Sequence, residues 1–285
     1  MGSARLEYCI PGGLGIFGRK VNLETILTSV TRPSDVHVRH AKLKRGDLIF
    51  LQLGRMAHHR AAQRGPRKTR TNELAGARSL QSHGAKLAML PEAPTLARLR
   101  NAQIYFIVSP DIPKWNPNPN YVQPKDANQV AEWVKQGGVL VLMENDPSNA
   151  DLDHFNLIAG KFGLHFDNVL KHHVIEPHHG PGYIPVTGSG PIFHHPHTLY
   201  MKDTCGISVK APATAVFSDK EGIVIASANY GKGMAVAVID PWLYNEYTDH
   251  RKVNPAQQNF AAGQEFALWL IQHAQHNPHP QQESR

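Results

Sequence analysis

Residues 137–146 read GGVLVLMEND, and residues 104–111 read IYFIVSPD. Each segment is an apolar run of strand length that ends at a carboxylate. Residues 126–136 (DANQVAEWVKQ) lie between them and have the period of a helix, one face of which would carry Ala127, Val130, Ala131 and Val134. Neither strand alternates between polar and apolar residues. The pattern therefore predicts an α/β fold with a mostly parallel sheet that is covered on both faces.

Three predicted strands end in short polar motifs. In parallel sheets, ligands bind beyond the carboxyl ends of the strands. The motifs are Ser109-Pro110-Asp111, Glu144-Asn145-Asp146 and Asp240-Pro241-Trp242. If these strands are parallel, the carboxylates meet along one rim, where they could transfer protons, hold a cation or accept sugar hydroxyls. The catalytic candidates are therefore Asp111, Glu144, Asp146 and Asp240. The alternative is that each residue starts a turn or caps the next helix.

The segment after the last predicted strand is rich in aromatic residues. Residues 240–252 read DPWLYNEYTDHRK, so three aromatic rings alternate with carboxylates and an arginine. Such a surface suits a carbohydrate or a planar ligand, whereas the alternative is a loop packed by its own aromatic side chains. The candidate ligand-binding residues are five side chains of this segment and the amide of Asn145 at the end of the earlier strand: Asn145, Trp242, Tyr244, Glu246, Tyr247 and Arg251.

Histidine is concentrated in one region, since nine of the 18 histidines lie between His154 and His197. Histidine is the commonest transition-metal ligand, and this density could hold zinc or nickel through His194, His195 and His197. There is no HExxH motif, however, and the alternative is a set of exposed loop residues that bind metal only incidentally. We therefore predict no cofactor.

Nothing in the sequence indicates covalent catalysis. A nucleophile elbow needs Ser or Cys directly after a strand, as in GxSxG, but VLVLM is followed by Glu144-Asn145-Asp146. Cys205 follows no apolar strand. Cys9 and Cys205 have no CxxC partner, so neither a zinc ribbon nor a disulfide framework is predicted.

The net charge of +7 is concentrated in one segment. Residues 39–70 hold ten Lys and Arg against a single acid, Asp47. We interpret residues 1–75 as an atypical, partly disordered basic segment, in which residues 48–53 (LIFLQL) could form a strand. Clustered Lys and Arg can bind nucleic acid, but no aromatic residue is interleaved in residues 55–70 for base stacking, so nucleic acid is not the expected partner.

No secretory signal is readable, and the longest apolar runs are shorter than the ~20 residues that span a bilayer. We therefore expect no membrane partner and, by default, a cytoplasmic location.

The remaining elements follow from local patterns. We predict an α/β domain over residues 76–275 and a polar tail over residues 276–285. Its further elements are a strand at 85–90, a short helix within 91–103, a helix at 150–162, a strand starting at 164, an irregular region at 167–204, strands at 215–219, 222–230 and 233–240 with a hairpin turn at 230–233, and a last helix capped by Asn254-Pro255.

Five strings within residues 76–274 carry a family resemblance. They are GAKLAMLPEAP, IYFIVSPDIPKWNPNPNYVQPKDA, EWVKQGGVLVLMENDPSNADLDHFNLIAGKFGLHF, HTLYMKDTC and YGKGMAVAVIDPWLYNEYTDHRK. They resemble the glutamine-amidotransferase-like domain appended to bacterial unsaturated rhamnogalacturonyl hydrolases, which degrade pectin. The resemblance implies a flavodoxin-like, three-layer sandwich of the class I glutamine-amidotransferase type. Relatives of this kind are often exported.

Two departures from that family affect function. The hydrolase activity of those proteins resides in a separate α/α-barrel, which this chain lacks. The place of the amidotransferase nucleophile corresponds to about Asn145-Asp146.

We therefore expect a non-catalytic accessory domain in rhamnogalacturonan degradation, with a pectic carbohydrate or a glycosidase domain as partner. The alternative is a hydrolase, of the unsaturated rhamnogalacturonyl type or metal-assisted, that uses the strand-end carboxylates.

Overall fold

The computed structural model describes residues 48–53, 75–90, 92–110, 112–114, 116–242 and 257–276. The chain divides into two compact units. The first, Met1–His40, lies outside the described residues, and everything below concerns the second, Ala41–Arg285.

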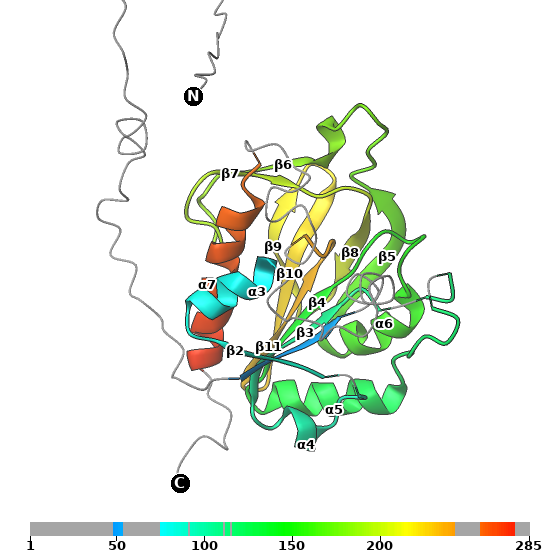
Figure 1. The fold of residues 1–285 in the computed structure, drawn as a ribbon, viewed down its shortest axis with the longest axis vertical. Helices are drawn as coiled ribbons and strands as arrows, with labels where there is room; N and C mark the ends of the chain where they lie inside the picture. The colour runs from blue at the N-terminus through cyan, green and yellow to red at the C-terminus, as the bar shows by residue number, and fades with distance from the viewer. Residues whose placement is uncertain are drawn as a thin grey trace, which may run out of the picture. The chain divides into compact units, whose positions relative to one another are not determined.

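A seven-stranded sheet forms the centre of the described unit (Figure 1). Its strand order is β2-β1-β3-β4-β11-β10-β9. The strands from β2 to β11 in this order run parallel, β10 pairs antiparallel with β11, and β9 pairs antiparallel with β10. The protein is thus mixed α/β with a mostly parallel central sheet, as predicted. The strands are β1 (Leu48–Leu53), β2 (Lys86–Met89), β3 (Ala102–Val108), β4 (Val139–Met143), β9 (Thr214–Asp219), β10 (Gly222–Tyr230) and β11 (Gly233–Val238).

Strands β3, β4 and β11 end together at one rim of this sheet. Val108 of β3 and Val238 of β11 both pair with Met143 at the end of β4. Every residue of the three strands is buried, which explains why their sequences show no polar alternation. The predicted convergence of these three strand ends is therefore confirmed.

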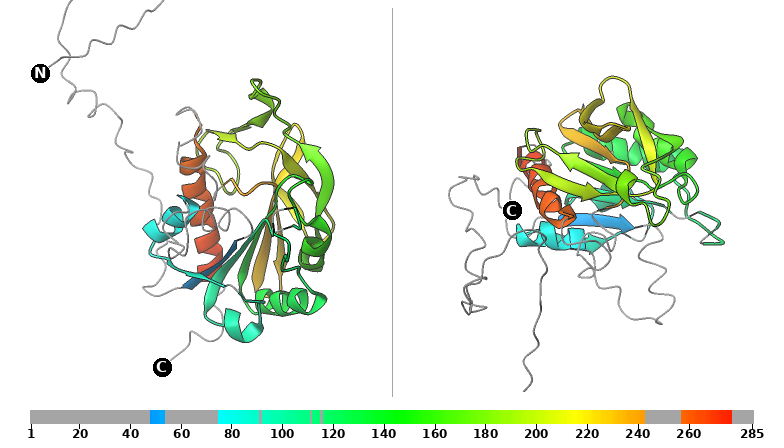
Figure 2. Two further views of the ribbon diagram at one scale, coloured as in Figure 1. Left: turned by 45° about the vertical axis from the view of Figure 1, so that its right-hand side comes forward. Right: turned by 90° about the horizontal axis from the view of Figure 1, so that it is seen from above.

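Helices cover both faces of the sheet. Figure 2 shows α3 and α7 on one side, with α5 and α6 on the other. The helices are α3 (Ala75–Ser82), α4 (Leu96–Leu99), α5 (Pro124–Lys135), α6 (Leu152–Ala159) and α7 (Asn259–His276). No helix in the described ranges is both long and apolar enough to span a membrane.

Helix α5 begins and ends as its sequence predicts. Pro124 occupies its first turn, where a missing N–H costs nothing, and Asp126 accepts a hydrogen bond of 3.0 Å from the backbone N–H of Gln123. After the last turn, Gly137 has φ of 126°, a conformation that glycine adopts without strain. These signals fix α5, and with it the connection between β3 and β4.

Two small antiparallel sheets lie beside the main one. They pair β5 (Leu164–Lys171) with β8 (Thr204–Val209), and β6 (Tyr183–Val186) with β7 (His197–Tyr200). The prediction of an irregular region at 167–204 is therefore wrong for β6 and β7, and for the part of β5 that runs to Lys171. Strands β6 and β7 have four residues each and pair with each other across residues 187–196, so neither has a long apolar or alternating run that would identify it.

Helix α6 is shorter than predicted. Asp151 caps its amino terminus, and its last turn becomes a 3-10 turn, Gly160–Phe162. Gly163, with φ of 78°, then ends the segment.

Strand β1 lies before the predicted start of the domain at residue 76. It pairs with β2 on one side and β3 on the other, so the strand predicted at 48–53 is confirmed and belongs to the central sheet. The rest of residues 1–75, for which we predict partial disorder, lies outside the described residues, except for Ala75 at the start of α3. The predicted cap at Asn254-Pro255 also lies outside them.

Candidate functional site

Glu144 follows β4 directly and is completely buried. Within the part of the chain that the structure describes, neither of its carboxyl oxygens has a hydrogen-bond partner. Burial, followed by the negative charges of Asp151 and Asp146, raises the pKa of Glu144 well above its ordinary value of 4.5. The backbone N–H of Asn145 acts to lower this pKa, but it forms no hydrogen bond of ordinary geometry with either carboxyl oxygen of Glu144. Glu144 therefore keeps its proton to a higher pH than an exposed glutamate does.

Asp240, just beyond the end of β11, is in a similar environment. It is 4% exposed, and its Oδ1 atom lacks a hydrogen-bond partner among the described residues. Burial and the charges of Asp146 and Asp203 raise the pKa of Asp240 well above 3.8. Two neighbouring strands of the sheet thus end in buried carboxyl groups whose pKa values are raised. A neutral carboxyl group can donate a hydrogen bond or a proton.

Cys205 lies in β8 and was not predicted to belong to this site. Its Sγ atom is buried and lies 3.5 Å from the carbonyl oxygen of Ile239. Burial, and then the charges of Glu144 and Asp240, raise the pKa of the Cys205 thiol well above 9.0. The residue therefore stays a thiol rather than the thiolate that a nucleophile requires. No sequence signal places it here, because β8 belongs to a different sheet.

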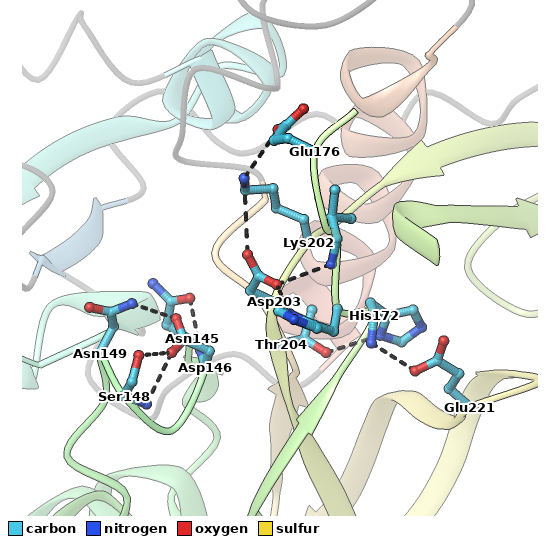
Figure 3. A network of polar contacts seen from close by, with 12 residues as sticks. Asn145, Asp146, Ser148, Asn149, His172, Glu176, Lys202, Asp203, Thr204 and Glu221 are labelled. Carbon is cyan, nitrogen blue, oxygen red and sulfur yellow. Dashed lines mark hydrogen bonds and ion pairs between the residues drawn. The ribbon is translucent and has the colours of Figure 1, made fainter. Parts of the chain in front are cut away.

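Asp146 has a different role from Glu144, although the two are neighbours in sequence. Its carboxylate accepts hydrogen bonds from the hydroxyl of Ser148, the backbone N–H of Ser148 at 3.0 Å and the side-chain amide of Asn149 at 2.6 Å (Figure 3). The side-chain oxygen of Asn145 accepts the backbone N–H of Asp146 at 2.8 Å. Asp146 and Asn145 thus form the turn between β4 and α6, which is the structural alternative stated above.

The aromatic segment after β11 is described only up to Trp242. The Trp242 ring is completely buried, and its centroid lies 6.5 Å from that of Phe266 in α7. Trp242 therefore belongs to the core and not to an exposed binding surface. The other predicted residues lie outside the described residues: Asp111, Tyr244, Glu246, Tyr247 and Arg251.

The predicted histidine cluster meets a carboxylate of α7. Nδ1 of His195 and Nε2 of His197 both approach Oε1 of Glu265, at 2.5 and 3.3 Å, and the backbone N–H of His194 donates to its Oε2 at 2.7 Å. Across the described ranges, no three His, Cys, Asp or Glu side chains are arranged to hold a metal ion. In this geometry the histidines attach the start of β7 to α7.

Two histidines of this region, His172 and His197, are buried, contrary to the expectation of exposed loop residues. His172 is 1% exposed, and its two ring nitrogens contact Thr204 and Asp219. Sequence reasoning had grouped it with exposed loop histidines.

An open cleft of about 470 Å³ lies beside the carboxyl end of β3. The strand order reverses between β1 and β3, and ligands of open α/β sheets bind at such a reversal. Residues 119–123, at the end of the proline-rich loop, and the start of α5 line the cleft, together with residues 92–94 before α4. The polar and aromatic lining is Glu92, Asn120, Tyr121, Gln123, Lys125 and Asp126.

Tyr121 is the aromatic residue in this lining. Its ring stacks on that of His154 from α6, with centroids 4.3 Å apart and an angle of 22° between the planes. The sequence analysis did not identify the cleft, because its walls come from segments that only the fold brings together. The available signal was the tyrosine in a stiff, proline-rich loop directly after a buried strand.

Comparisons with known proteins identify the fold alone. No family model matches the chain, and no curated protein matches it. Among solved structures, the mmIFT52 N-terminal domain is 14% identical, with a TM-score of 0.56 over 79% of this chain and 97% of that one. The cytoplasmic protein STM1381 from Salmonella typhimurium LT2 is 10% identical, with a TM-score of 0.49 over 81% of this chain and 99% of that one.

A beta-galactosidase from Rahnella sp. R3 is 13% identical, with a TM-score of 0.48 over 79% of this chain and 30% of that one. At these identities the likeness carries no statement about activity. The family resemblance seen in the sequence therefore stays a prediction.

Proposed function

We propose that the chain is a non-catalytic carbohydrate-binding module that accompanies a pectin-degrading glycosidase and binds rhamnogalacturonan fragments. In this proposal it has the flavodoxin-like, three-layer fold of the glutamine-amidotransferase-like domains. The strand order β2-β1-β3-β4-β11 supports that fold, because it corresponds to the 2-1-3-4-5 order of flavodoxin-like sheets. The observation that carries the functional proposal is the cleft beside β3.

The chemistry of the cleft suits a sugar. Its volume of about 470 Å³ is in the range of small-ligand pockets, and its lining combines one aromatic ring with amide and charged groups. The exposed amides of Asn120 and Gln123 can bond to hydroxyl groups, and Tyr121 offers an apolar ring to the C–H face of a sugar. The ammonium group of Lys125 can pair with the carboxylate of a uronic acid, which is the charged unit of pectin.

Two residues that could act as nucleophiles near the strand ends are unavailable for that role, which favours binding over covalent catalysis in this proposal. The Cys205 thiol is buried beside two carboxyl groups, and Asp146 is engaged in the turn after β4. Neither residue offers a reactive group to a ligand in the cleft.

The test is calorimetric titration of the full chain with rhamnogalacturonan oligosaccharides, with neutral cello-oligosaccharides for comparison. We expect saturable binding of the pectic fragments and an affinity loss of about tenfold or more in Tyr121→Ala, since a stacking aromatic ring is typical of residues that dominate binding energy. Tyr183→Ala is the matched control, because Tyr183 is a partly exposed tyrosine of β6 outside the cleft. A folded sample that releases no heat with any pectic fragment would overturn the proposal.

A second candidate function is hydrolysis by Glu144 and Asp240. It is favoured by one observation, namely that two buried acids with raised pKa values follow neighbouring strands. The test is release of product from unsaturated rhamnogalacturonyl oligosaccharides by the wild type, by Glu144→Gln and by Asp240→Asn. Activity that both substitutions abolish would support this function, and a wild type without activity would reject it.

A further inference from the structure

We propose that His154 is a positioning residue of the cleft, which holds Tyr121 so that the free face of its ring packs against the apolar face of a saccharide. The identity of the ligand rests on the proposed function. The positioning role rests on contacts that exist without any ligand.

His154 acts on the cleft through Tyr121. The two rings are stacked with centroids 4.3 Å apart, and Tyr121 lines the cleft whereas His154 does not. His154 therefore packs against one face of the Tyr121 ring without itself lining the cleft. Because one face of Tyr121 is covered in this way, the opposite face is the one left for a ligand.

The orientation of His154 is itself fixed. Its Nδ1 atom lies 2.9 Å from Oδ1 of Asp151, and the same carboxylate caps helix α6 by accepting the backbone N–H of His154. The side chain of Asp151 is only 11% exposed, whereas that of His154 is 42% exposed. A rigid helix end thus holds an imidazole ring at the surface, and the ring in turn supports Tyr121.

A second contact attaches the same loop to the same region. Lys114, near the start of the proline-rich loop, donates to the side-chain oxygen of Asn149 at 3.4 Å. The amide group of Asn149 donates to Asp146 at 2.6 Å. The loop is therefore joined through Asn149 to the segment between β4 and α6, and through His154 to α6 itself. Since prolines restrict the backbone between these two contacts, they determine where Tyr121 stands.

These contacts give the turn after β4 a structural role in the cleft. Asp146 is a candidate for chemistry in the sequence because it follows a buried strand, whereas Asp151 caps the next helix. In the structure they orient Asn149 and His154, which hold the proline-rich loop. The cleft is consequently preformed, and a preformed aromatic ring costs a ligand less entropy than a mobile one.

The experiment compares His154→Ala, which removes the stacked ring, with His154→Phe, which keeps a ring but loses the bond to Asp151. His273→Ala is the matched control, because His273 packs against Trp269 at 4.6 Å on helix α7, outside the cleft. Ring proton shifts of Tyr121 are recorded by NMR in the ligand-free protein, and affinity for a rhamnogalacturonan oligosaccharide is measured by calorimetry.

We expect His154→Ala to move the Tyr121 ring resonances and to weaken binding about three- to tenfold, as loss of one aromatic contact does. His154→Phe should restore affinity to within about twofold of wild type, because the stacking is kept. His273→Ala should change neither readout.

Two results would overturn the inference. Tyr121 resonances that stay unchanged in His154→Ala would show that the ring is not held by His154, whatever the ligand. Wild-type affinity in His154→Ala, with loss of binding in Tyr121→Ala, would show that positioning is irrelevant while leaving the proposed function intact. Failure of every pectic fragment to bind the wild type would reject the proposed function, and the resonance shift would still decide the role of His154.

Discussion

Nε2 of His172 lies 2.8 Å from a carboxylate oxygen of Asp219, and the two side chains are only 1% and 4% exposed. On the other side of the ring, Nδ1 of His172 lies 3.0 Å from the hydroxyl of Thr204 in β8. The second oxygen of Asp219 accepts the backbone N–H groups of Glu221 and Gly222 in the turn before β10. The contacts of this imidazole therefore join the small β5-β8 sheet to the antiparallel edge of the main sheet.

Replacing Asp219 by Asn should destabilise the fold strongly. The substitution removes a charged acceptor that faces a buried imidazole, and a hydrogen bond to a charged group contributes about 1.5 to 3 kcal/mol. Urea denaturation of both proteins measures the change. Glu176→Gln is the control, because the Glu176–His179 pair is exposed and should contribute no more than about 0.5 kcal/mol. Equal losses in the two variants would contradict the prediction.

Replacing Glu144 by Gln should increase stability progressively as the pH rises. The pKa of Glu144 is raised in the folded protein, so the folded state binds the proton more tightly than the unfolded state does. The resulting stability is fully present below the ordinary value of 4.5 and is lost as the pH rises towards the raised pKa. Gln cannot ionise and avoids this loss.

Urea denaturation at pH 5 and at pH 8 checks the effect of Glu144→Gln. The gain of the variant over the wild type should be larger at pH 8. A difference in stability that is the same at both values would show that the pKa of Glu144 is not raised in the folded protein.

The Glu265 cluster should respond to pH in the opposite direction. Burial acts to raise the pKa of Glu265, but the hydrogen bonds from His195 and the backbone of His194, together with His197, lower it overall. A lowered pKa gives stability that is present above the ordinary value of 4.5 and is lost as the pH falls through the folded value. Glu265→Gln should therefore unfold at less urea than the wild type at pH 7, and the two should approach each other near pH 3. A gap that widens towards acid pH would contradict this assignment.

Substitution of Gly138 should damage the packing of α5 on the sheet. A Cβ atom at Gly138 would lie 2.4 Å from Cε2 of Trp133, whose ring is completely buried. Gly138→Ala should cost about 1 to 3 kcal/mol, because the indole has no space to move into. Thermal unfolding measures the loss.

Gly160→Ala is the matched control for Gly138→Ala. Nothing lies within 4 Å of a Cβ atom at Gly160, and its φ of −61° suits any residue. This variant should be neutral or more stable, by up to about 1 kcal/mol. A comparable loss in both variants would indicate a general effect of removing glycine rather than the contact with Trp133.

The parts of the fold that the sequence predicts are those whose signals are local. Strands β3 and β4 are continuous apolar runs, and α5 has both its apolar stripe and its start and stop residues within one window. Strands β6 and β7 carry no such signal, because Pro185 interrupts a four-residue strand whose partner lies beyond a long loop. Local sequence patterns therefore identify the central sheet and its helices, but not the small β6-β7 sheet beside them.

The candidate site shows the same limit. The convergence of Glu144 and Asp240 follows from two strands that the sequence identifies as parallel. The cleft does not follow, since Tyr121 meets His154 only after α5 and β4 have folded between them. Residue type alone also cannot separate Glu144 from Asp146, because one carboxyl group lacks partners and the other has several.

The pairing of β4 with β11 has a consequence for how the protein is made. It places Val139 beside Met234, so the middle of the sheet is assembled from segments that leave the ribosome far apart in time. Until β11 has been synthesised, the nascent chain carries β3 and β4 with one apolar edge unpaired. Long-range parallel pairing of this kind folds slowly, and unpaired apolar strands aggregate. We therefore expect the growing chain to depend on chaperones until its last strand emerges.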